Sequence, residues 1–389
     1  MATFIAPPSI SVADVSIAEG NAGTTNAVFT VTLSGPSSQI VTVTAATSNL
    51  SATSGSDYTA TGPTVLTFAP GVVTQQFLVP ITGDTSVESD ETFTVTLSAP
   101  ANGEILDGQA TGTITNDDGA PPSRVFVSES GSDANDCAIQ TTPCRNLAAA
   151  VGQVSIDGEV IFLTPGEYDT APILIGKGVK ISAGSGTVAF IRQPITINAP
   201  GGRVSLRGLT LKGSGSGTAA TLVAADSVSL EEVSFDRWSI ALNLLNASAS
   251  RITVANSTFA ANAFGITDQN AGAASLISIT GTRFDRNSNT AMDIYGATTT
   301  VSESAFVGNL NGIFVGPGSA DIRDSEFWGT GNGTLVSFPG GALSLSRSHV
   351  FGNVIGLVGN GGLTVSFGNN VIRGNGTDTA GGITTVPEQ

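Results

Sequence analysis

Three short segments, NSTFAAN (256–262), GTRFDRN (281–287) and ESAFVGN (303–309), share one pattern, with Phe at the fourth position and Asn at the seventh. The blocks GLTLKGS, EVSFDRW, DSEFWGT, RSHVFGN and GNNVIRG align with them. The fourth positions of all eight blocks are Leu211, Phe235, Phe259, Phe284, Phe306, Phe327, Val350 and Val371. Their separations are 24, 24, 25, 22, 21, 23 and 21 residues. A period near 23 with short β segments predicts a parallel β-helix, one coil per repeat.

The repeat also predicts what fills and lines such a solenoid. Each aromatic is expected to stack inside on its counterpart one coil away, at about 4.8 Å. The recurring Asn262, Asn287, Asn309 and Asn353 are expected to form a hydrogen-bonded ladder along one turn. About 250 residues at this period would then make about 11 coils. The helical segment RNLAAAVGQV (145–154) precedes the first coil and suits a cap over that end.

The first 116 residues follow a different pattern. Seven short alternating runs between residues 9 and 116 indicate a β-sandwich. The segment NDDGAPPSR (116–124) breaks the alternation and reads as a short, stiff connection. We therefore predict an all-β chain with a sandwich at 1–118, a linker at 119–124 and the solenoid at 125–389.

Two cysteines, Cys137 and Cys144, lie in DCAIQTTPC. A separation of seven residues can close a small disulfide loop, which would imply an oxidising location, whereas free thiols are the alternative. Zinc is disfavoured because two thiols and the distant His349 do not make a tetrahedral site.

Charge is distributed unevenly along the chain. The 389 residues carry 31 acidic and 15 basic side chains, for a net charge of −16. Residues 1–123 hold 11 acidic and no basic residues, and the remainder holds 20 and 15, for −5. Such a chain repels nucleic acid and anionic membranes, so cations are the natural partners of the first segment. No run of 18 apolar residues predicts a membrane span.

The stretch GDTSVESDETF (83–93) concentrates this negative charge. Other carboxylates lie at expected strand ends, which meet at one pole of a sandwich. Hard cations such as Ca²⁺ need several oxygen ligands, so these loops predict one or two calcium sites. The candidate ligands are Glu19, Asp57, Asp84, Glu88, Asp117 and Asp118. The alternative is that they are solvated turn carboxylates, since Asp favours turns.

The segments VSIAEGNAG, GSDYTATGPTVLTFAPG, ITGDTSVESDETFTVTLS and GTITNDD, in this order, resemble a Calx-beta domain, an immunoglobulin-like sandwich related to the regulatory domains of sodium–calcium exchangers. The resemblance covers about 9–118, and it implies calcium ligands at the same six acids. One departure is Gly83-Asp84, where exchanger domains place paired acids. The resemblance therefore leaves one of several ion sites weak or missing.

The second part is similar to the pectin-lyase-like right-handed parallel β-helix superfamily over 124–380. The similarity rests on VFVSESGSDANDCAIQTTPCRNLAAAV as entry sequence and GEVIFLTPGEYDTAPILI as first coil. The fold carries lyases, hydrolases, adhesins and inert rods. The best catalytic candidates are Asp268 with Asp293, expected on adjacent coils, and Asp236-Arg237 with Asp285-Arg286, expected in one column two coils apart. Surface ion pairs are the commoner meaning of such acid–base neighbours.

The expected function is an extracellular structural or adhesive surface protein with a calcium-binding sandwich, whose export signal is not visible in the sequence. The alternative is a polysaccharide lyase or glycoside hydrolase acting on acidic glycans, so enzymatic activity is left open, although no catalytic residue is assigned. Head-to-tail self-association into filaments is a further expectation. It rests on the absence of a cap after Val371 and on the apolar N-terminal segment MATFIAPPSISV.

Overall fold

The structure is a computed structural model of the 389-residue chain. It describes residues 6–86, 88–169, 171–184, 186–245, 250–268 and 275–387. The chain divides into two compact units, residues 1–120 and 121–389. Residues 1–5, which begin the N-terminal segment expected to take part in self-association, lie outside the described residues.

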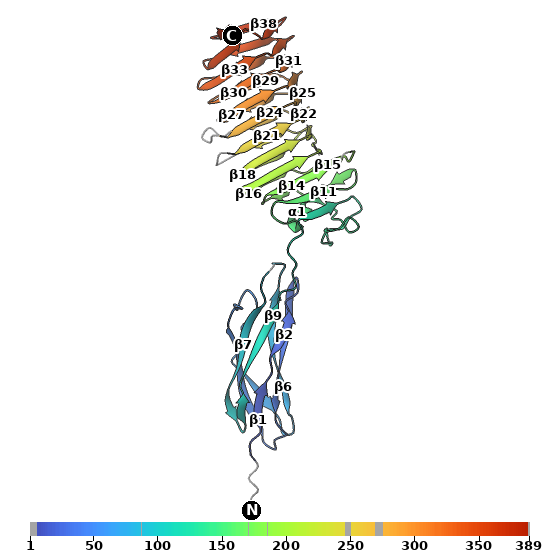
Figure 1. Cartoon of the computed structure of the whole chain (residues 1–389), viewed down its shortest axis with the longest axis vertical. Coiled ribbons are helices and arrows are strands. Elements are labelled where there is room, and N and C mark those ends of the chain that lie inside the picture. Colours follow the sequence, from blue (N-terminus) through green and yellow to red (C-terminus); the bar gives the residue numbers. More distant parts are fainter. Residues whose placement is uncertain are drawn as a thin grey trace, which may run out of the picture. The chain divides into compact units, whose positions relative to one another are not determined.

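The first unit is a sandwich of two sheets (Figure 1). One sheet has the order β6-β3-β1-β8 and the other the order β2-β9-β7-β4-β5. The strands are β1 (Ser9–Val12), β2 (Val15–Ala18), β3 (Gly23–Leu33), β4 (Val41–Asn49), β5 (Thr64–Phe68), β6 (Thr74–Gly83), β7 (Glu91–Ala101), β8 (Glu104–Asp107) and β9 (Gln109–Thr115).

Alternation of apolar and polar residues explains this core. Strand β3 buries every second side chain from Ala27 to Leu33, and Phe29 packs edge-on against Phe93 of β7 with ring centroids 5.8 Å apart. One expected run, SISVADVSI, forms two strands in different sheets, because the chain changes sheet at Ala13-Asp14. The short strand β8 was not predicted.

The second unit is a parallel β-helix of about nine turns from residue 158 onward, fewer than the expected 11 or so. The estimate divided the whole region by the period, including the residues before the first coil, which supply β10, a disulfide loop and a helix. One sheet has ten strands, all paired in parallel. They are β12 (Gly166–Tyr168), β15 (Ala189–Ile191), β17 (Leu209–Lys212), β19 (Ser234–Asp236), β22 (Thr258–Ala260), β25 (Arg283–Asp285), β28 (Ala305–Val307), β31 (Glu326–Trp328), β34 (His349–Phe351) and β37 (Val371–Arg373).

The other solenoid sheet has twenty strands, also parallel. They are β10 (Arg124–Val127), β11 (Gly158–Phe162), β13 (Ile173–Ile175), β14 (Val179–Ala183), β16 (Ile195–Arg207), β18 (Thr218–Glu231), β20 (Ile240–Leu244), β21 (Arg251–Ala255), β23 (Phe264–Asp268), β24 (Leu276–Thr280), β26 (Thr290–Ile294), β27 (Thr298–Ser302), β29 (Asn311–Val315), β30 (Gly318–Arg323), β32 (Gly333–Ser337), β33 (Gly341–Ser346), β35 (Ile355–Gly359), β36 (Leu363–Phe367), β38 (Thr377–Gly381) and β39 (Thr384–Val386).

The predicted aromatic column forms the centre of the solenoid core. Phe235, Phe259, Phe284, Phe306 and Phe327 are fully buried, and consecutive rings stack with centroids 4.5–4.8 Å apart. The prediction is wrong at the last coil. There Val350 pairs with Ile372, and Val371 pairs with the exposed His349, so the column is one residue out of register at that point.

The asparagine ladder is confirmed. Asn287 Nδ2 donates to Asn309 Oδ1 at 2.8 Å, and Asn262 Nδ2 donates to Asn287 Oδ1 at 3.2 Å. Each also donates to a backbone carbonyl of the preceding coil, so buried amides are satisfied without water. Thr330 replaces Asn in one coil and hydrogen-bonds Asn353 Oδ1 at 2.9 Å.

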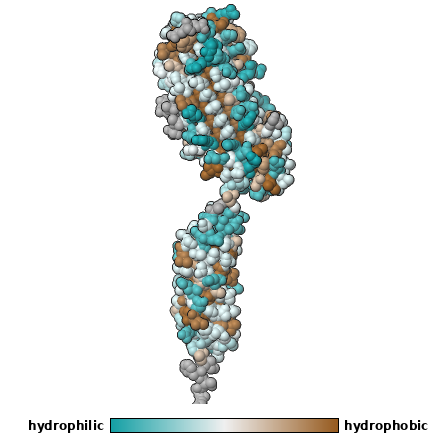
Figure 2. Space-filling model, viewed as in Figure 1, coloured by the Kyte–Doolittle hydropathy of each residue, from teal (hydrophilic) through white to brown (hydrophobic). Residues whose placement is uncertain are grey.

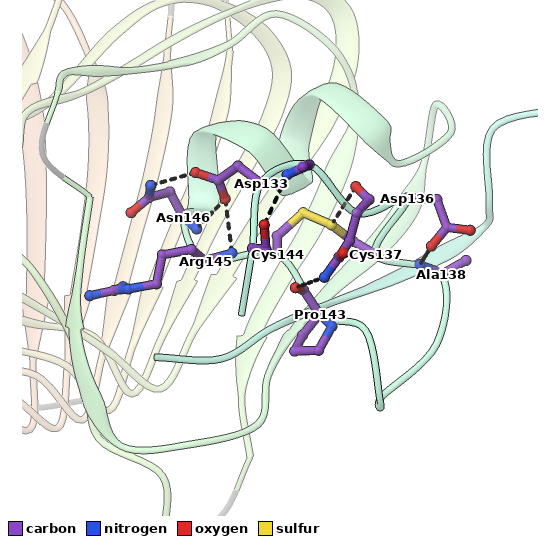
Figure 3. The surroundings of a disulfide bond; sticks show 11 residues. Asp133, Asp136, Cys137, Ala138, Pro143, Cys144, Arg145 and Asn146 are labelled. Carbon is purple, nitrogen blue, oxygen red and sulfur yellow. Dashed lines mark hydrogen bonds between the residues drawn. A yellow bond between two sulfur atoms is a disulfide. The ribbon is translucent and has the colours of Figure 1, made fainter. Parts of the chain in front are cut away.

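A short helix and a disulfide occupy the start of the solenoid. Helix α1 (Leu147–Gln153) buries Leu147, Ala150 and Val151 and contacts β10, the first strand of the twenty-stranded sheet. Cys137 and Cys144 form a disulfide (Figure 3). Asp133 accepts hydrogen bonds from the backbone N–H groups of Arg145 and Asn146, both at 2.8 Å, which ties the disulfide loop to the approach of α1.

Candidate metal centre

Acidic residues from several loops meet at one end of the sandwich. Strands β2 and β9 run parallel and end together, with Ala18 opposite Thr115. Strand β7 begins at the same level, because Glu91 pairs with Ile114 of β9. The segments that follow β2, β6 and β9 therefore share this pole. Figure 2 shows hydrophilic surface at the end of the sandwich where the chain leaves it.

Glu19 lies at the centre of this acidic pole. It directly follows β2 and is only 5% exposed. Its Oε1 atom is buried and has no hydrogen-bond partner among the described residues. Burial raises the pKa of the Glu19 carboxyl, and the negative charges of Asp84, Glu88, Asp118 and Asp117 raise it further. A buried carboxylate in this setting favours binding either a proton or a cation.

A second group of carboxylates adjoins the first. Oxygen atoms of Asp57, Glu88 and Glu91 lie within 4.8 Å of one another. Burial, a hydrogen bond with Asp57 and the charge of Asp57 raise the pKa of Glu91 to about 7. Burial opposes ionisation of Asp57, but hydrogen bonds with Thr53, Ser56 and Glu91 outweigh it and lower the Asp57 pKa. The Asp57–Glu91 pair thus shares a proton near neutral pH.

Asn116 holds the loops of this pole together. Its Oδ1 accepts from the backbone N–H of Glu88 at 3.2 Å, and its own N–H donates to Asp90 Oδ1 at 3.1 Å. Its Nδ2 donates to the backbone carbonyl of Asp118 at 2.9 Å. The side chain therefore couples the loop between β6 and β7 to the segment after β9.

Asp117 and Asp118 face the segment after β2. Asp117 Oδ1 accepts from the backbone N–H of Gly20 at 2.9 Å, and Asp118 Oδ1 accepts from Asn21 Nδ2. The other oxygen of Asp118 is buried without a hydrogen-bond partner among the described residues. Glu19 and Asp118 therefore each leave one buried carboxylate oxygen free to meet a ligand.

Gly83 accounts for the departure from the paired acids of exchanger domains. A Cβ atom at this position would lie 2.1 Å from the backbone oxygen of Gly20 and 2.7 Å from that of Glu19. Strand β6 therefore approaches the Glu19–Gly20 backbone too closely for any side chain at residue 83. The local backbone excludes a carboxylate here.

The structure gathers all six candidate ligands at this one pole. Glu19, Asp84, Glu88, Asp117 and Asp118 interact electrostatically, and Asp57 joins through Glu88 and Glu91. Sequence reasoning omitted Glu91 and Asn116 from this set. Glu91 begins β7 in the same acid-rich stretch, which was the available signal. Nothing in the sequence marks Asn116, because its role comes from loops distant in the chain.

The solenoid acids are arranged differently from the expectation. Thr267, not Asp268, pairs with Asp293, so Asp268 and Asp293 do not stack in one column. Asp268 is buried and its Oδ2 accepts from the Ala297 N–H at 2.9 Å. Burial, with the charge of Asp268, raises the pKa of Asp293 to about 6.

The second pair of solenoid candidates does share a column. Asp236 and Asp285 lie two coils apart, both opposite Ala260, as expected. Each carboxylate is engaged by the arginine that follows it, Arg237 at 3.1 Å and Arg286 at 2.7 Å. Both acids are therefore held in ion pairs with arginines, although Asp285 itself is buried.

The first unit is an all-β sandwich whose acidic loops converge at one pole. Residues 8–118 match the Calx-beta domain family, so this part of the chain is a Calx-beta domain. No helix in the described part of the chain is both long and apolar enough to cross a membrane. No curated protein matches the chain.

Solved structures similar to the chain include the apo-form CBD1 domain of Calx, at 25% identity and a TM-score of 0.25, covering 28% of this chain and 98% of that one. The CBD12 structures of CALX1.2 and CALX1.1 are each 26% identical and cover 31% of this chain. Their TM-scores are 0.26 and 0.25, and this chain spans about half of their lengths, 47% and 53%.

Proposed function

We propose that the Calx-beta domain binds Ca²⁺ at its acidic pole. The observation that carries the proposal is the pair of buried, unpartnered carboxylate oxygens on Glu19 and Asp118. No basic residue exists in residues 1–123 to neutralise them. One of the similar structures is described as a calcium binding domain, which supports the same ion.

The residues that would hold the ion are those whose charges meet at the pole. Ca²⁺ takes six to eight oxygen ligands, which carboxylates supply in one- or two-oxygen contacts. Glu19 and Asp118 contribute the unpartnered oxygens, and the group of Asp57, Glu88 and Glu91 adds a second set. Asn116 holds the loops that carry these ligands through its hydrogen bonds to Glu88, Asp90 and Asp118. It therefore positions these ligands.

The proposed role of the whole chain is an extracellular structural or adhesive surface protein. The disulfide at the start of the solenoid supports an oxidising location. The solenoid presents a long regular surface, and of its catalytic candidates Asp236 and Asp285 are engaged in ion pairs and Asp268 is buried, which leaves Asp293 without a partner acid in its column. Calcium would stiffen the acidic pole from which the chain enters the linker.

Calorimetric titration of the full chain with Ca²⁺ tests the proposal. We expect saturable binding that Glu19→Gln weakens by at least about tenfold, since the central carboxylate loses its charge. Glu104→Gln is the matched control, because Glu104 is exposed on β8, which follows the opposite end of β7. Absence of binding by the unmodified chain, or equal weakening by both variants, would contradict the proposal.

A further inference from the structure

One column of side chains on the ten-stranded sheet places two large aromatic residues next to each other. Strand register places Asp285, Val307, Trp328, Phe351 and Arg373 side by side on five successive coils. Their neighbours on each strand belong to the core column, so these side chains point away from the core. Asp285 and Val307 are nevertheless buried, whereas Trp328, Phe351 and Arg373 are exposed. Two large aromatics therefore line one outer strip, with Arg373 at one end and Asp285, which is ion-paired with Arg283 and Arg286, at the other.

The two aromatic rings form an exposed pair. The ring planes of Trp328 and Phe351 are 3° from parallel, with centroids 6.4 Å apart. Trp328 is 43% exposed and Phe351 is 40% exposed. Large aromatic side chains usually lose most of their surface on folding, so two adjacent exposed rings indicate a contact surface.

The turn beside this strip leaves the rings uncovered. Gly308, Gly329, Gly352 and Gly374 follow the strip residues and have positive φ angles. Earlier coils place Arg237, Ala261 and Arg286 at the same turn position with φ of 59°, 55° and 50°, so side chains can adopt this conformation. A Cβ at Gly352 or Gly374 would meet nothing within 4 Å. The glycines therefore keep the approach to the aromatic rings open.

Two shallow cavities flank the aromatic pair. One, of about 500 Å³, is lined by Trp328, Val307 and the residues Arg283, Asp285 and Arg286. The other, of about 550 Å³, is lined by Phe351, His349 and Arg373. Both volumes fall in the range of small-molecule sites, which runs from about 300 to 1,000 Å³.

Positive charge exceeds negative charge in both cavities. Asp285 is bonded to Arg286 at 2.7 Å and to Arg283 at 3.0 Å, so two cations share one carboxylate. Arg373 has no ion pair among the described residues. Glu326 is exposed on the same face of β31, but it lines neither cavity. An excess of cations on a chain of net charge −16 points to an anionic ligand.

We infer that this strip binds an acidic saccharide, a pyranose residue that carries a carboxylate. The apolar face of a sugar ring packs on an aromatic side chain, and a guanidinium group binds a carboxylate through two parallel hydrogen bonds. Single-stranded nucleic acid fits less well. It needs a continuous cationic groove for its backbone, whereas this chain is strongly acidic. The inference concerns the solenoid and does not depend on calcium binding by the sandwich.

Tryptophan fluorescence provides a direct test. The chain has two tryptophans, and Trp238 is buried, with its Nε1 donating to the Leu211 carbonyl at 3.0 Å. A spectral change on binding therefore reports Trp328. Full-length protein is titrated with a hyaluronan hexasaccharide, with the uncharged cellohexaose, and with oligothymidylate. We expect a saturable blue shift with the acidic sugar alone, weakened by added salt.

Substitutions in the strip test whether its residues bind the acidic saccharide. Trp328→Ala and Arg286→Gln should each weaken binding by at least about tenfold, measured by calorimetry, as expected for central aromatic and arginine contacts. Tyr295→Ala is the control, because Tyr295 is a comparably exposed aromatic, 36%, that follows β26 of the other sheet. Thermal unfolding of each variant confirms that it is folded, and Phe351→Ala replaces any that is not.

Three outcomes would overturn the inference: no binding of the acidic sugar, equal binding of cellohexaose, or tighter binding of oligothymidylate. Undiminished binding by Trp328→Ala would also overturn it. The titration is repeated with Glu19→Gln and with chelator present, where sugar binding should be unchanged. Loss of calcium binding alone would then leave this inference standing, and loss of sugar binding alone would leave the calcium site standing.

Discussion

Calcium affinity should depend on pH through one identifiable carboxyl group. Without calcium, the pKa of Glu91 is raised to about 7 by burial and by Asp57. A metal ligand must be deprotonated, so calcium binding displaces this proton. For a single group with a pKa of 7, apparent affinity should fall roughly tenfold between pH 8 and pH 6. At pH 7, binding should release about half a proton from this group.

The same pKa predicts how the stability of the calcium-free fold depends on pH. Between the ordinary Glu pKa of 4.5 and about 7, the folded chain holds a proton that the unfolded chain has released. The unfolded state then binds fewer protons, so stability falls as pH rises through this window. Saturating calcium should remove this loss, because the ion takes the place of the proton.

Calorimetric titrations at pH 6, 7 and 8, each in two buffers with different ionisation enthalpies, measure both quantities. Glu91→Gln should bind calcium more weakly and with most of the pH dependence removed, because the titrating carboxyl is gone. Glu104→Gln should keep the full dependence, since Glu104 is distant from Asp57 in the fold. Equal affinity of the unmodified chain at pH 6 and pH 8, or an unchanged pH profile in Glu91→Gln, would refute the reasoning.

Further predictions concern the two cores and the close approach at the metal pole. Phe284→Ala should destabilise the solenoid by about 3–5 kcal/mol in denaturant unfolding, whereas the exposed Phe351→Ala should cost far less. Asn287→Ala should cost about 1–3 kcal/mol, because it leaves buried ladder partners unsatisfied; an unchanged midpoint would contradict this. Gly83→Ala should lower both the melting temperature of the sandwich and its calcium affinity, since the new Cβ meets the Gly20 oxygen at 2.1 Å. Gly35→Ala, with nothing within 4 Å, should change neither.

Periodicity alone determined the architecture of this chain. A 21–25-residue spacing of apolar core residues, several of them followed three residues later by Asn, is satisfied by coils that stack in register. Neighbouring coils then repeat the same contacts, as the ring spacings of 4.5–4.8 Å bear out. Alternation with period two determined the sandwich in the same way. Head-to-tail association and the extracellular location remain predictions.

The spacing identifies the core residue less clearly in repeats that have no aromatic residue. At the last coil two apolar residues, Val371 and Ile372, stand side by side, and the alignment took the wrong one. Only backbone pairing to β34 decides which faces inward. Asp268 shows the same limit, because one residue of register places it inside the solenoid, whereas Asp293 pairs with Thr267 and is only partly buried.

The six acids could be chosen from the sequence because strand ends of a sandwich meet at a pole and no cation is available nearby. What the sequence could not supply is how those loops are held. Asn116 links its own segment to the loop between β6 and β7 through contacts 26 and 28 residues apart, and Gly83 is a glycine because a distant backbone passes 2.1 Å from its missing Cβ. Composition and period act along the chain, whereas these contacts exist only after the sheets have packed. The fold therefore followed from the sequence, and the detailed geometry of the metal pole from the tertiary structure.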